Sequence, residues 1–133
     1  MVTRLKSRGK SGFTLLEMMI VMIIIGVLLS IALPIYNRSL LRSREAVLRN
    51  DLFELNKLIQ QYTLDKQKAP QSLDDLKPTY IKEIPKDPIT GAADWNQEMC
   101  DTVDSVDQQE PGLCDVKSSS TAISSEGDPY NTW

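Results

Sequence analysis

The most apolar segment of the chain is MMIVMIIIGVLLSIALPIYN, residues 18–37. These 20 residues carry no charge. As an α-helix they would extend about 30 Å, which is the thickness of the hydrocarbon core of a bilayer. A helix buried in a soluble protein usually shows a polar stripe, and this run has only Gly26 and Ser30. The segment therefore predicts a membrane-spanning helix rather than a helix in a globular core.

The charges on either side of this segment indicate its orientation and exclude several functions. Residues 1–12 have four bases and no acid, whereas residues 94–133 have nine acids and one base. Basic residues beside a span favour the cytoplasmic side, so we expect a cytoplasmic N-terminus with the rest of the chain outside the cytoplasm. The acidic body argues against nucleic acid binding. The chain has no His, which excludes Ser-His-Asp, Cys-His and Cys₂His₂ sites, and we expect no enzyme.

Glu17 is the one charged residue at the start of the apolar region. A carboxylate inside a membrane costs about 2.5–3.5 kcal/mol on insertion scales, so a functional role is the default interpretation. A position near enough to the interface to reach water is the alternative. An ordinary secretory signal peptide would be cut after the apolar part, but no small-residue cleavage site follows Leu33.

A distinctive motif, GFTLLE, occupies residues 12–17 directly before the apolar run. Together with the short basic leader, it resembles the class III signal of type IV pilins and type II secretion pseudopilins. The resemblance implies that a prepilin peptidase cuts after Gly12 on the cytoplasmic side and methylates the new amino terminus at Phe13. It also implies that Glu17 serves assembly, by pairing with the Phe13 amine of its own or a neighbouring subunit. Such a pair would offset the desolvation of both charges.

Two later stretches make the resemblance more specific. Residues 80–88 read YIKEIPKDP and residues 126–133 read EGDPYNTW. Both look more like the major pseudopilin of type II secretion than like a type IVa pilin. The family usually continues with Trp-Gly-Asn-Pro-Tyr after the Asp-Pro, and this chain has Ile89-Thr90-Gly91 instead.

Beyond the span, apolar residues recur every three or four positions, which predicts that an amphipathic helix continues. This stripe comprises Leu41, Val47 or Leu48, Leu52, Leu55, Ile59 and Tyr62. We expect one long helix over about residues 14–65, a short turn begun by Ser72 and Asp75, and short strands at 93–98 and 113–117. The expected fold is pilin-like α+β, a long N-terminal helix on a small head with a short antiparallel sheet. The expected parts are a cleaved leader (1–12), a transmembrane and filament-core half-helix (13–36), an amphipathic half-helix (37–65) and an extracytoplasmic head (66–133).

Cys100 and Cys114 are the only cysteines. An oxidising compartment outside the cytoplasm favours a disulfide between them. Closing a loop of about 15 residues contributes about 3 kcal/mol in the chain-entropy description. A redox pair or a metal site is the alternative, although two thiols without His make a poor metal site.

The resemblance also implies a calcium site, because major pseudopilins bind this ion in a C-terminal loop. The candidate oxygen ligands are Asp115, Ser118, Glu126 and Asp128. Ser119-Ser120-Thr121 stands where the family's loop usually places an Asp, and one carboxylate fewer weakens affinity. A solvated acidic loop without an ion is the favoured interpretation, so no cofactor is certain. The acidic run 94–110 is likewise interpreted as a solvated surface.

The resemblance implies a structural subunit of a type II secretion pseudopilus, which helps export proteins across the outer membrane. It implies self-assembly, and as partners a prepilin peptidase, other pseudopilins and an inner-membrane platform with its cytoplasmic ATPase. The expected location is the bacterial inner membrane, as a single-pass protein with a periplasmic head, and then a periplasmic filament. A type IV pilin for adhesion, motility or DNA uptake is the alternative. A membrane anchor with a ligand-binding head and no assembly is a third interpretation.

Overall fold

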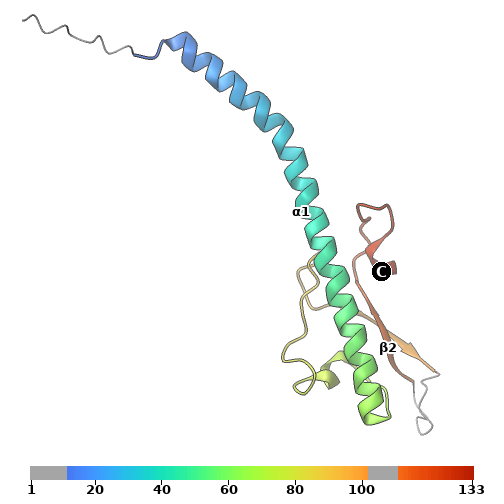
Figure 1. The fold of residues 1–133 in the computed structure, drawn as a ribbon. Helices are drawn as coiled ribbons and strands as arrows, with labels where there is room; N and C mark the ends of the chain where they lie inside the picture. The colour runs from blue at the N-terminus through green and yellow to red at the C-terminus, as the bar shows by residue number, and fades with distance from the viewer. Residues whose placement is uncertain (1–11, 102–110) are drawn as a thin grey trace, which may run out of the picture. The chain divides into compact units, whose positions relative to one another are not determined.

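The computed structural model describes residues 12–101 and 111–133. These residues form helix α1 (Leu15–Lys66), the 3₁₀ turn η1 (Leu73–Leu76), strands β1 (Asn96–Cys100) and β2 (Gly112–Lys117), and the 3₁₀ turn η2 (Tyr130–Thr132) (Figure 1). A long N-terminal helix with a small two-stranded antiparallel sheet is the expected pilin-like α+β fold. The chain divides into two compact units, residues 1–38 and 39–133.

Local interactions define both ends of α1. Thr14 precedes the first turn, and its Oγ1 accepts a hydrogen bond from the Glu17 amide at 3.2 Å, as an N-cap residue does. At the other end Gln67 has a φ of 53°, the left-handed conformation that commonly ends a helix. The side chain of Gln67 also donates to the Leu64 carbonyl oxygen at 2.8 Å. These bounds differ by one residue from the helix that the apolar pattern predicts.

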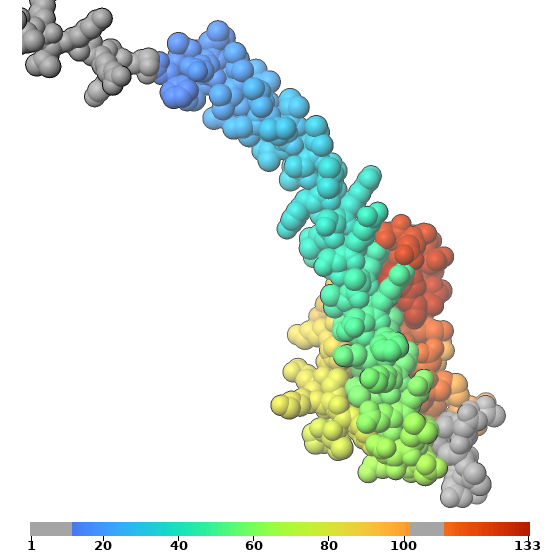
Figure 2. Space-filling view, viewed as in Figure 1, coloured from blue at the N-terminus to red at the C-terminus, as the bar shows by residue number. Residues whose placement is uncertain are grey.

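The first unit presents apolar side chains to its surroundings. Among the described residues, α1 is the one helix long and apolar enough to cross a membrane, with a mean hydropathy of 2.9 over its most apolar window, none of which is buried. Figure 2 shows these side chains in the blue part of the helix. Phe13 and Leu15 are 72% and 81% exposed. In water such a surface would be unfavourable, so it requires lipid or another protein to cover it.

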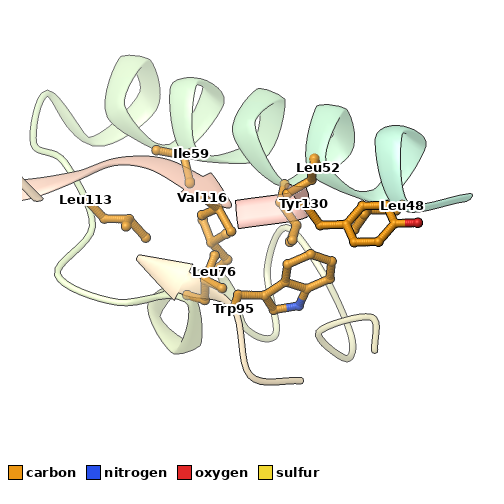
Figure 3. Close-up of a cluster of buried hydrophobic side chains, with 10 residues drawn as sticks. Leu48, Leu52, Ile59, Leu76, Trp95, Leu113, Val116 and Tyr130 are labelled. Carbon is orange, nitrogen blue, oxygen red and sulfur yellow. The ribbon is translucent and has the colours of Figure 1, made fainter. Parts of the chain in front are cut away.

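The hydrophobic core lies in the second unit, between α1 and the segments that follow it (Figure 3). In Figure 1 the connection 67–95 runs along one side of α1, and the sheet and C-terminal segment run along the other. The buried core residues are Leu48, Leu52, Leu55, Ile59, Leu73, Leu76, Trp95, Leu113, Val116 and Tyr130. Within the predicted stripe, Leu48 is buried and Val47 is 48% exposed, which decides between those two neighbours.

Strands β1 and β2 pair in antiparallel fashion, from Asn96 opposite Lys117 to Cys100 opposite Gly112. The register shifts between Glu98 and Met99, which leaves Cys114 as an extra residue on β2. The first strand begins three residues later than the sequence predicts. The side chains before it are engaged elsewhere: the Trp95 indole N–H donates to the Pro85 carbonyl oxygen at 2.8 Å, and the Asp94 carboxylate accepts from Thr90 and Ser119.

The turn expected from Ser72 and Asp75 is present as η1. The Asp75 carboxylate accepts the Ser72 amide at 3.1 Å and the Gln71 amide at 2.7 Å. These bonds satisfy backbone donors that the short turn itself cannot pair. Leu73 and Leu76 are thereby directed into the core.

Candidate assembly site

Gly12 and Phe13 lie outside α1, directly before its first turn. Both residues are exposed, and no other described atom lies within 4 Å of the place where a Cβ would stand on Gly12. A non-helical, exposed peptide bond is the form of substrate that a peptidase can bind. The basic leader residues 1–11 lie outside the described residues.

Glu17 lies in the first turn of α1. The helix N-terminus carries a partial positive charge, which stabilises a carboxylate there. The Glu17 amide is bonded to Thr14, whereas its carboxylate makes no hydrogen bond or ion pair with the part of the chain that the structure describes. A partner for this carboxylate therefore comes from outside the helix: the cleaved amino terminus, another subunit or water.

The structure also shows a buried carboxylate that the sequence analysis missed. Glu45 is 6% exposed and accepts three hydrogen bonds from the C-terminal segment (residues 122–133). The Ser125 amide donates at 2.6 Å, the Ser125 hydroxyl at 2.5 Å and the Tyr130 hydroxyl at 2.8 Å. One signal was available in the sequence, because Glu45 falls between Leu41 and Leu48 on the four-three spacing of the apolar stripe.

The surroundings of Glu45 favour its charged form. Burial alone raises the pKa of the carboxyl, but the hydrogen bonds from Ser125 and Tyr130 and the charge of Arg49 outweigh it, so the pKa is lowered. Tyr130 shows the complementary effect, because burial and the adjacent Glu45 carboxylate raise its pKa to about 12. The pair is therefore a carboxylate and a neutral phenol at neutral pH.

A second buried carboxylate, Asp87, joins two loops. It is fully buried and accepts the Ser118 hydroxyl at 2.5 Å and the Ile89 amide at 2.7 Å. These bonds connect the turn 87–92 to the segment after β2. Ser118, one of the four calcium candidates, thus already donates its hydroxyl proton to a carboxylate of the same chain.

The other calcium candidates have separate contacts. Asp115 lies on β2, and its Oδ1 accepts the Val116 amide at 2.9 Å. Glu126 forms an ion pair with Arg49 at 2.5 Å, and Asp128 is exposed. Among residues 12–101 and 111–133, no three His, Cys, Asp or Glu side chains gather in a group that could hold a metal ion.

Cys100 and Cys114 are joined by a disulfide, with their Cα atoms 5.8 Å apart. The bond links the end of β1 to β2 and closes a loop with a sequence separation of 14. Residues 102–110 of this loop, which include much of the predicted acidic surface, lie outside the described residues.

We expect the intact protein to be lighter by about 2 Da than its reduced form, the mass of the two hydrogens lost when the bond forms. Reduction, or the double change Cys100→Ser and Cys114→Ser, should lower the free energy of unfolding by about 3 kcal/mol. Mass spectrometry and denaturant unfolding measure these two effects. Complete alkylation of both thiols without a reductant would contradict the disulfide.

Comparison with known proteins identifies the class to which this helix and head belong. The family model for the prokaryotic N-terminal methylation motif matches residues 7–33. Type II secretion system core protein G from Aeromonas hydrophila is 36% identical to this chain, and the match covers 63% of the chain and 71% of that relative. The corresponding protein from Vibrio cholerae is 37% identical, over 62% of the chain and 68% of the relative. The chain belongs to the family of type II secretion core protein G, the major pseudopilins.

A pilin is also among the similar proteins. The type IV major fimbrial protein FimA from Dichelobacter nodosus is 37% identical, over 47% of this chain and 39% of FimA. No solved structure matches the chain significantly. The broader coverage by core protein G places the chain with the pseudopilins, which are structural proteins and not enzymes.

Proposed function

We propose that this pseudopilin is a structural subunit of a type II secretion pseudopilus, a helical filament that helps drive protein export across the outer membrane. The observation that carries the proposal is the methylation motif over residues 7–33, placed at the start of an apolar helix that its own chain leaves exposed. A free-standing apolar helix is a poor design for a soluble protein. It suits a subunit that moves from a lipid environment into a bundle of identical helices, where packing between helices replaces contact with lipid.

The charge pattern supports one orientation of the subunit. Four bases precede the apolar half of α1, which favours a cytoplasmic N-terminus and a head in the periplasm. The disulfide between Cys100 and Cys114 suits that oxidising compartment. The anchored form then lies in the inner membrane with a single span, and the assembled form lies in the periplasm.

Processing and assembly follow from this placement. Prepilin peptidase cuts after Gly12 and methylates Phe13, and the new amine pairs with the Glu17 carboxylate. Because that carboxylate has no partner among the described residues of its own chain, an intermolecular pair would favour subunits in the correct axial register. Other pseudopilins and the inner-membrane platform with its cytoplasmic ATPase are the remaining partners that we propose.

N-terminal mass analysis of the protein from its host membranes tests the proposal. The expected mature chain begins at methylated Phe13, and Gly12→Val should leave the leader attached because a branched side chain obstructs the cleavage point. Gly26→Ala is the matched control, since Gly26 also has open space around it but lies within the helix. A chain that still begins at Met1 would rule out processing and with it the pseudopilin role.

A type IV pilin remains the alternative function, and mechanical shearing separates the two. A pilin appears in long extracellular fibres that shear from intact cells, whereas a periplasmic pseudopilus stays with the cells. We expect the mature protein to remain in the cell fraction.

A further inference from the structure

The C-terminal loop, residues 122–130, has a donor set that does not fit the calcium ion expected from the family. Calcium takes six to eight oxygen ligands, mostly carboxylates and carbonyls. Ser118 donates to Asp87, and Asp115 accepts a backbone amide of its own strand. The two acidic side chains that remain, Glu126 and Asp128, line one hollow together with Arg49.

Arg49 supplies the positive charge in that hollow. Its guanidinium group pairs with Glu126 and lies 4.3 Å from the centre of the Trp133 ring, a cation–π contact. A divalent cation placed there would be repelled by Arg49 and would have to compete with it for Glu126. The hollow is therefore already neutralised by a side chain.

The backbone groups of the loop are also paired with one another. The Ser124 amide donates to the Asp128 carbonyl oxygen at 2.8 Å, and the Tyr130 amide donates to the Ala122 carbonyl oxygen at 3.0 Å. Gly127, with a φ of 101°, allows the tight reversal between them because it has no Cβ. The loop thus closes on itself through hydrogen bonds that use carbonyls of the kind that a bound ion would need.

Glu45 connects this closed loop to α1. Its two oxygens accept both the amide and the hydroxyl of Ser125 and the hydroxyl of Tyr130. Hydrogen bonds to a charged, buried acceptor are stronger than bonds between neutral groups. Removing the charge leaves three donors without a good acceptor, and that is costly in a buried place.

We propose that Glu45 is the residue that organises the C-terminal loop and that this loop is held on α1 without a divalent cation. A carboxylate from the helix, bonded to donors of the loop, does the work that a metal ion would do between carboxylates of the loop. The proposal concerns the folded subunit and does not depend on filament assembly, so its failure and that of the proposed function are distinguishable.

Thermal unfolding of the full-length protein in detergent micelles tests the role of a cation. The fluorescence of Trp95 and Trp133 reports on the core and on the loop. We expect the melting temperature to be the same after treatment with the chelator EGTA and after addition of calcium chloride. A lower melting temperature after chelation that calcium restores would overturn the proposal.

Substitutions test the role of Glu45. Glu45→Gln should lower the melting temperature by about 5 °C or more, whereas Glu54→Gln, which changes an exposed carboxylate of the same helix, should leave it nearly unchanged. Equal effects of the two changes would overturn the proposal. Should Glu45→Gln prevent folding, Tyr130→Phe removes a single hydroxyl and should still lower the melting temperature measurably; an unchanged value would also count against the proposal.

Discussion

Glu17→Ala is expected to abolish incorporation of the subunit into the filament while the protein continues to insert into the membrane. The two effects have opposite signs for one physical reason. Removing a carboxylate from the apolar region favours insertion by about 2.5–3.5 kcal/mol, so the anchored form is retained. The same change removes the proposed partner of the Phe13 amine, and an unpaired ammonium group in an apolar bundle is strongly unfavourable. Cross-linking between copies in intact cells should therefore fall to background.

The control for this experiment is Ser30→Ala, which removes another polar group from the apolar half of α1 but no charge. It should cross-link like the unchanged protein, and all three proteins should be found in the membrane fraction of cells that lack the filament. Normal cross-linking of Glu17→Ala would show that the carboxylate is dispensable and lies close enough to the interface to be solvated.

Leu55→Ala is expected to lower the free energy of unfolding of the head by about 3 kcal/mol, since loss of a fully buried leucine side chain leaves a cavity. Leu55 is 0% exposed, whereas Leu64 on the same helix is 72% exposed, so Leu64→Ala is the matched control and should have little effect. Denaturant unfolding in detergent, followed by tryptophan fluorescence, measures both. Equal losses for the two variants would contradict the packing of α1 on the head.

The size of this effect reflects how small the head core is. One face of α1 contributes Leu48, Leu52, Leu55 and Ile59, and the segments after it contribute short pieces rather than large sheets. Domains of this size have a free energy of unfolding of only about 5–15 kcal/mol. Loss of one core leucine therefore removes a large share of the stability, which the disulfide helps to provide.

Several features could be predicted from the sequence because they depend on local patterns. The apolar run and the basic residues before it indicate a membrane helix, and the four-three spacing from Leu48 to Ile59 marks the face that packs on the head. The start of β1 was predicted less well, because Asp94 and Trp95 read like strand residues. Their side chains are instead held by Thr90, Ser119 and Pro85, contacts that the spacing of apolar residues does not reveal.

Local chemistry was thus sufficient for the membrane helix, its cap at Thr14, the processing motif and the apolar stripe, since each depends on residues within a few turns of one another. The loop closure on α1 could be recognised only from the folded chain. Glu45 and Tyr130 are separated by 85 positions, and either residue alone reads as an ordinary helix or terminal residue. Whether a carboxylate binds a metal ion, an arginine or a phenol depends on which donors folding brings beside it, and a charge buried on folding must find such donors.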